Sequence, residues 1–142
     1  MYDVNAITNA CLNGHIQILE WFDKSKYEFM YNKYAISNAC YYGHINILDW
    51  FDKSKYDFMY DESAISNACY NGHINILEWF NKSCYEFKYT YHAIDYASRN
   101  GYLHILKWLR KTNYEFRYEQ AKYLACIYGH KEILLWFEKH KL

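Results

Sequence analysis

Apolar residues recur along the chain in two short helical patterns separated by one glycine. The first pattern places four apolar residues at positions i, i+1, i+4 and i+5, on one face of a helix: Ala6, Ile7, Ala10 and Cys11. The second pattern covers most of a helix surface: Ile16, Ile18, Leu19, Trp21 and Phe22. Gly14 lies between them and predicts a tight turn, because glycine adopts positive φ at little cost. Together the patterns predict a helix–turn–helix unit.

The same unit recurs along the whole sequence. Glycines lie 29, 29, 29 and 28 residues apart, at Gly14, Gly43, Gly72, Gly101 and Gly129, and the five tryptophans repeat these intervals. The units span about 1–29, 30–58, 59–87, 88–115 and 116–142. Each helix has only about two or three turns, too few to be stable alone in water, so each must pack on its neighbours. We therefore predict one domain, 1–142, made of ten stacked helices in five repeats.

The core of the unit reads A-I-x-N-A-C-x-x-G-H-I-x-I-L-x-W-F. This core resembles the helix pair of the ankyrin repeat, and Gly43-His44-Ile45 with Ile47-Leu48 is its most characteristic part. The 29-residue period, the Trp-Phe endings and the Tyr-x-Phe linkers resemble the divergent ankyrin repeats of giant amoebal viruses. The resemblance covers all five units and implies an all-α, curved solenoid with the first helices lining the concave side. The tetratricopeptide repeat, with 34 residues and no Gly-His signature, fits less well.

The sequence departs from the usual ankyrin pattern in three places. The unit is four residues shorter than the usual 33 and lacks Thr-Pro, so we expect short or irregular β-turn fingers. The last unit has Lys122 and Lys131 where the others carry Ile or Leu, so we expect a C-terminal cap whose lysines solvate an open face. The first unit has no such polar replacement, so we expect an exposed N-terminal face or a segment of a longer array.

Composition narrows the possible environments. Basic and acidic residues number 16 each, and this neutral balance disfavours nucleic acid and anionic membranes as partners. No apolar run approaches the roughly 20 residues of a membrane-spanning helix, and the N-terminus shows no secretory signal. Five cysteines, four of them at one repeat position, favour small core residues over disulfides. We expect an intracellular protein that is not secreted, and the viral resemblance implies the host cytoplasm.

A Cys-x3-His pair occurs in four units, at Cys11/His15, Cys40/His44, Cys69/His73 and Cys126/His130. A zinc site needs four ligands, whereas each unit supplies two that straddle a turn, and the fourth unit has Ser98 and Tyr102 instead. A catalytic pair would also need a third orienting group and would occur once. We therefore predict no metal, no cofactor and no enzymatic activity. We expect cysteines that pack in the core, and the resemblance implies histidines that bond the turn backbone.

The pair of residues before each glycine differs between units that are otherwise similar. In the ankyrin family the matching pair lies on the concave face and often contacts the partner. Tyrosine and arginine are also typical of protein-binding hot spots. We predict a binding site made of Leu12, Asn13, Tyr41, Tyr42, Tyr70, Asn71, Arg99, Asn100 and Tyr128. A second variable patch lies in the linkers, at residues 32–34, 61–63, 90–92 and 119–120.

These observations favour a scaffold that binds another protein and no small-molecule substrate. Single-stranded nucleic acid is the alternative, because bases could stack on exposed tyrosines. A third hypothesis is a spacer within a longer array, since units one to three have barely diverged.

Overall fold

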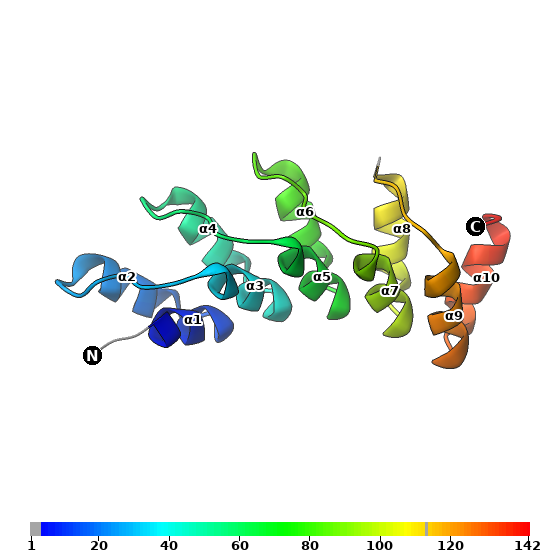
Figure 1. Cartoon of the computed structure of the whole chain (residues 1–142), viewed down its shortest axis with the longest axis horizontal. Helices are drawn as coiled ribbons and strands as arrows, with labels where there is room; N and C mark the ends of the chain where they lie inside the picture. The colour runs from blue at the N-terminus through cyan, green and yellow to red at the C-terminus, as the bar shows by residue number, and fades with distance from the viewer. Residues whose placement is uncertain (1–3, 113) are drawn as a thin grey trace.

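The computed structural model describes residues 4–112 and 114–142, and over these residues the chain forms ten α-helices and no β-strand (Figure 1). The helices are α1 (Val4–Leu12), α2 (Ile16–Lys24), α3 (Lys33–Tyr42), α4 (Ile45–Lys53), α5 (Glu62–Tyr70), α6 (Ile74–Lys82), α7 (His92–Arg99), α8 (Leu103–Lys111), α9 (Glu119–Ile127) and α10 (Lys131–Lys139). The predicted all-α class is thereby confirmed for the described residues. None of the described helices is long and apolar enough to cross a membrane.

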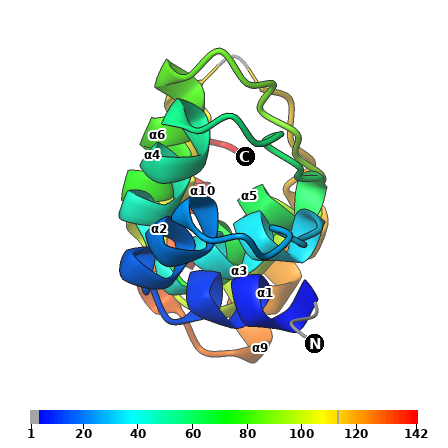
Figure 2. The same cartoon turned by 90° about the vertical axis from the view of Figure 1, so that its left-hand side faces the viewer.

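The helices lie in two rows. Each odd-numbered helix contacts the next odd-numbered one, from α1 to α9, and each also packs on the even-numbered helix that follows it. Along the even-numbered row, contacts run from α2 to α8 and are less extensive. Figure 1 shows a shallow arc with the odd-numbered helices on its inner side, and Figure 2 shows the two rows nearly end-on. The tighter packing of the odd-numbered row accounts for this curvature.

Small side chains allow the odd-numbered helices to approach closely. Ala35, Ala39 and Cys40 of α3 are fully buried, and α5 repeats the pattern with Ala64, Ala68 and Cys69. The even-numbered helices supply the bulk of the core, as Leu48 and Phe51 do from α4. Stacking therefore buries one continuous apolar core through the described residues.

Each pair of helices is joined by a glycine turn. Gly43 ends α3 with φ of 76°, and the backbone N–H of His44 donates to the carbonyl of Ala39 at 2.9 Å. A bond of this span over a left-handed glycine is the Schellman arrangement, which satisfies carbonyls that the helix end leaves open. The turn places the residues just before the glycine at the exposed end of each odd-numbered helix.

Stacked aromatic rings hold the linkers against the even-numbered helices. The ring of Phe29 packs on both Trp50 and Tyr56, with centroids 5.5 and 4.0 Å away, and these two rings also stack on each other. Phe58 repeats the arrangement with Trp79 and Tyr85, at 5.4 and 4.2 Å. Face-to-face packing of this kind adds to area burial by about 0.5–1.5 kcal/mol per pair. These ring contacts hold the linkers in place, although the described linkers form no β-strand.

The two ends of the array differ from its middle. Cys126 was expected in the core, but it is exposed because no further helix pair of the described chain covers it. The other three cysteines at this repeat position, Cys11, Cys40 and Cys69, are buried as predicted. At the N-terminal end Ile18 is 40% exposed, whereas the equivalent Ile47 is 0% exposed. This exposure fits both expectations for the first unit, an open N-terminal face and a segment of a longer array.

Candidate functional site

The nine predicted binding residues, called here the tyrosine stripe, lie at or just after the ends of the odd-numbered helices. Each retains accessible surface: Asn13, Tyr42 and Tyr128 are exposed, and Leu12, Tyr41, Tyr70, Asn71, Arg99 and Asn100 are half-buried. Their shared position before the glycine turn explains this placement, because the helix stops there and the side chains are not covered by the next helix of the unit.

Three tyrosines form a continuous row of rings across successive units. Tyr41 stacks on Tyr70, with centroids 5.9 Å apart and planes inclined by 22°. Tyr70 in turn meets the edge of Tyr96 at 5.3 Å, and Tyr42 meets Tyr41 at 4.9 Å. Tyr96 was not predicted, although it stands where two sibling units carry Asn38 and Asn67. That departure from the repeat was the available signal.

Arg99 and Tyr128 form a second contact in the stripe. The guanidinium of Arg99 lies over the ring of Tyr128, 5.1 Å from its centroid. At an exposed site such a cation–π contact contributes about 0.5–1 kcal/mol, and it holds both side chains at the helix ends. At the other end of the stripe, the side-chain amide of Asn13 donates to the carbonyl of Asn9 at 2.8 Å.

Hydrogen bonds from each following unit fix the backbone of the stripe. The carbonyl of Tyr41 accepts from the amide of Asn71 at 2.9 Å and from Nε2 of His73 at 3.0 Å. The carbonyl of Tyr70 accepts from Asn100 at 2.7 Å. Since a carbonyl only accepts, the Nε2 atom of His73 must carry the proton. The Asn71 and Asn100 amides therefore serve the array itself and hold the tyrosines in place.

Other histidines of the repeat also donate to a backbone carbonyl of the preceding unit. His44 donates from Nε2 to the carbonyl of Leu12 at 3.0 Å, and His130 donates to the carbonyl of Arg99 at 2.7 Å. The resemblance implied bonding to the turn backbone, and the structure adds that the turn belongs to the preceding unit. The His44 ring also covers Gly14, because a Cβ built there would lie 2.8 Å from Nδ1. Bond and ring contact together couple neighbouring units.

The three buried cysteines, Cys11, Cys40 and Cys69, pack in the core. Burial raises the pKa of the Cys11 thiol to about 12 and raises those of Cys40 and Cys69 as well. A thiolate, the form that attacks substrates or binds metals, is therefore disfavoured at these positions. No group of three or more His, Cys, Asp or Glu side chains in the described ranges could hold a metal ion.

Two members of the second variable patch cap helices. The Asn32 side chain accepts from the backbone N–H of Tyr34 at 3.0 Å, and Asp61 accepts from that of Ser63 at 3.0 Å. Such N-caps contribute about 1 kcal/mol each. Lys33 also pairs with Asp61 of the next unit. Variation in this patch therefore follows local capping chemistry as well as surface exposure.

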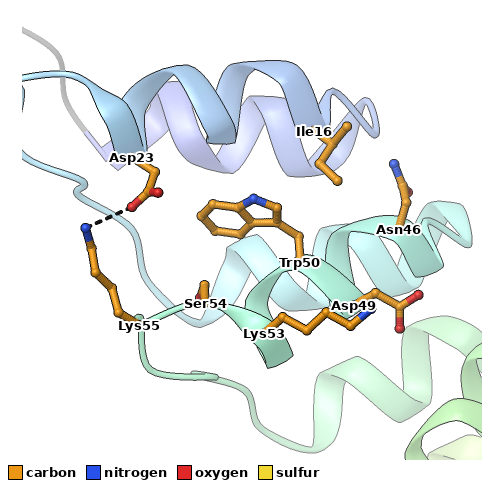
Figure 3. A pocket seen from close by; sticks show the side chains of 8 residues that line it. All are labelled: Ile16, Asp23, Asn46, Asp49, Trp50, Lys53, Ser54 and Lys55. Carbon is orange, nitrogen blue, oxygen red and sulfur yellow. Dashed lines mark ion pairs between the residues drawn. The ribbon is translucent and has the colours of Figure 1, made fainter.

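A hollow of about 540 Å³ lies between α2 and α4 in the even-numbered row (Figure 3). Trp50 forms part of its lining, and Nζ of Lys55 pairs with Asp23 across its rim at 2.9 Å. The hydroxyl of Tyr56 also donates to Asp23 at 2.9 Å. Hydrogen bonds from Lys55 and Tyr56 lower the pKa of Asp23 and keep its carboxylate charged. The partners of this carboxylate thus come from the array itself, and none of the predicted stripe residues lines the hollow.

The stripe presents aromatic faces and a guanidinium on a backbone that neighbouring units hold in place. Such an arrangement is suited to contact with a large, partly apolar surface. No model of a known protein family matches the sequence, and no curated protein matches it either.

Proposed function

We propose that the chain is an ankyrin-like array of five repeats that holds another protein through the tyrosine stripe on its concave side. The observation that carries the proposal is the ring row of Tyr41, Tyr70 and Tyr96, which spans three successive units and remains accessible. The ankyrin-like Gly-His core of each unit supports the family assignment, and the arc formed by the odd-numbered helices supports the concave placement.

The mechanism is rigid presentation. Hydrogen bonds such as that from the side-chain amide of Asn71 to the backbone carbonyl of Tyr41 fix the stripe before a partner binds, so little ordering entropy is lost on binding. Tyrosine adds large contact area with only two side-chain torsions to restrict. In this role the protein needs no cofactor and catalyses no reaction, and it acts inside the host cell.

Single-stranded nucleic acid is the second candidate, because the accessible rings of Tyr42 and Tyr128 could stack on bases. The balance of 16 basic and 16 acidic residues weighs against it. The salt dependence of the binding affinity distinguishes the two hypotheses. Binding to a nucleic acid should weaken steeply between 50 and 200 mM salt, by about 10³- to 10⁵-fold for 6–10 phosphate contacts, whereas binding through tyrosine faces should change little.

The direct test captures partners from host-cell lysate with the intact array and with the Tyr41→Ala/Tyr42→Ala/Tyr70→Ala variant. Tyr34→Ala serves as the matched control, since Tyr34 is also exposed but belongs to the linker patch. We expect a partner that the intact array and the control retain and that the triple variant loses while its circular dichroism is unchanged. Equal capture by all three proteins would contradict the stripe, and capture of nothing would favour the spacer hypothesis.

A further inference from the structure

A groove of about 680 Å³ lies between α7 and α9, where the fourth unit departs most from its siblings. Asp95 and Tyr96 of α7 and Leu124 of α9 are among its lining residues. In two earlier units the position of Asp95 is Ser37 and Ser66, and that of Tyr96 is an asparagine. The groove is therefore formed by residues that the repeat itself does not require.

Asp95 is buried without its full set of partners. Its side chain is 5% exposed, and Oδ1 has no hydrogen-bond partner in the described part of the chain. Between α3 and α5 the side-chain amide of Asn67 donates to the backbone carbonyl of Ser37, whereas between α7 and α9 the residue in register is Leu124, whose side chain can donate neither to the backbone nor to the carboxylate of Asp95. An unmet buried carboxylate costs stability, so this residue weakens the free array.

Aromatic and charged groups surround this carboxylate. The ring of His92 stacks on Tyr96, with centroids 5.7 Å apart, and both line the groove. Burial raises the pKa of Asp95, and the nearby His92 acts in the opposite sense. Arg99 also lines the groove, and its guanidinium lies over the ring of Tyr128. Arg117, just before α9, and Glu119, its first residue, also line the groove and carry opposite charges.

We propose that this groove binds a lysine or arginine side chain from an extended segment of the protein partner. Its cationic group pairs with the Asp95 carboxylate, which lines the groove, and lies against the ring of Tyr96. Charge-assisted hydrogen bonds and cation–π contacts both favour a basic side chain over a neutral one. The inference rests on the proposed function, because it names what that partner contributes.

The binding test uses a library of random 12-residue peptides displayed on phage, selected against the intact array. We expect peptides enriched in a single basic residue. Exchange of that residue for Gln in the synthetic peptide, or of Asp95 for Ser or Asn in the array, should weaken binding by about tenfold or more. Combining the two exchanges should cost no more than either alone, because both remove the same contact.

A second measurement follows the unfolding of the free array in urea. Asp95→Ser, which restores the residue of the sibling units, should raise the unfolding midpoint as it abolishes peptide binding. A lowered midpoint would show that Asp95 has an internal structural role and would overturn the inference. The inference would also be overturned if no peptide were enriched, or if the selected peptides bound the Asp95→Ser variant as tightly as the intact array. Peptides lost only with Tyr41→Ala/Tyr70→Ala would overturn this inference and leave the proposed function standing.

Discussion

The contact between a glycine and the histidine ring of the next unit can be measured by replacing one glycine that has this contact and one that lacks it. Gly14 and Gly129 lie in the first and last units and have φ of 70° and 75°. A Cβ on Gly14 would lie 2.8 Å from Nδ1 and 2.9 Å from Cε1 of His44, whereas a Cβ on Gly129 would meet nothing within 4 Å. Both alanine variants are strained at positive φ, but only Gly14→Ala displaces a ring.

The expected costs follow from these distances. Left-handed backbone in a non-glycine residue costs about 1–2 kcal/mol, which is the whole effect at Gly129. At Gly14 the ring must also move, and its bond to the Leu12 carbonyl, 3.0 Å in the intact array, is then lost. A lost hydrogen bond adds about 0.5–1.5 kcal/mol. Gly14→Ala should therefore cost about 1.5–3.5 kcal/mol in total, against about 1–2 kcal/mol for Gly129→Ala.

The assay is urea unfolding followed by tryptophan fluorescence and by circular dichroism. A double-mutant cycle with His44→Ala isolates the ring contact, because without the ring Gly14→Ala should cost only the backbone strain, about 1–2 kcal/mol. Equal costs for Gly14→Ala and Gly129→Ala, or a cost at Gly14 that stays the same in the His44→Ala background, would refute the coupling of units through this contact.

Three further predictions concern stability and assembly. Ile47→Ala should lower the free energy of unfolding by about 2–5 kcal/mol, whereas Ile18→Ala at the same repeat position should cost under about 1 kcal/mol, and equal costs in urea would contradict the open N-terminal face. Lys122→Ile with Lys131→Ile should make the array self-associate in analytical ultracentrifugation, and a double mutant that stays monomeric would refute the cap. Burial lowers the pKa of His73 below 6.5 in the folded protein. The neutral ring therefore adds its full share to the free energy of unfolding above about pH 6.5, and this share is lost as the pH falls through the pKa of the folded state. His73→Gln should therefore flatten part of the decline in unfolding midpoint between pH 7.5 and 5.5, and an unchanged slope would be the contrary result.

The sequence was sufficient to predict the features that depend on one unit. Helical periodicity gives the two helices, and Gly43 with its positive φ gives the turn between them. The position of the tyrosine stripe follows as well, since residues before that glycine must stand at a helix end. Burial of Cys40 and Cys69 was predictable because a small residue recurs on the apolar face.

Features that depend on two units were not predictable in the same way. Periodicity shows that His73 lies beside its own turn, but only stacking shows that its ring reaches the carbonyl of Tyr41 in the unit before. The same holds for Asn71, predicted as a binding residue, whose amide is used within the array. Cys126 is exposed for the converse reason, because its unit carries the cysteine at the usual position but no further helix pair of the described chain covers it.

The fourth unit shows how a repeat array can acquire a distinct site without losing its stack. Tyr102 replaces the histidine and keeps the ring contact, since a Cβ on Gly72 would lie 2.9 Å from its ring. Tyr102 has no ring N–H, but two other bonds to the preceding unit are kept. His104 donates from Nε2 to the carbonyl of Gly72 at 3.0 Å, as Asn46 does to Gly14 at the same repeat position, and Asn100 donates to the carbonyl of Tyr70. The fourth unit therefore stays tied to its predecessor while it carries Asp95 at the next interface.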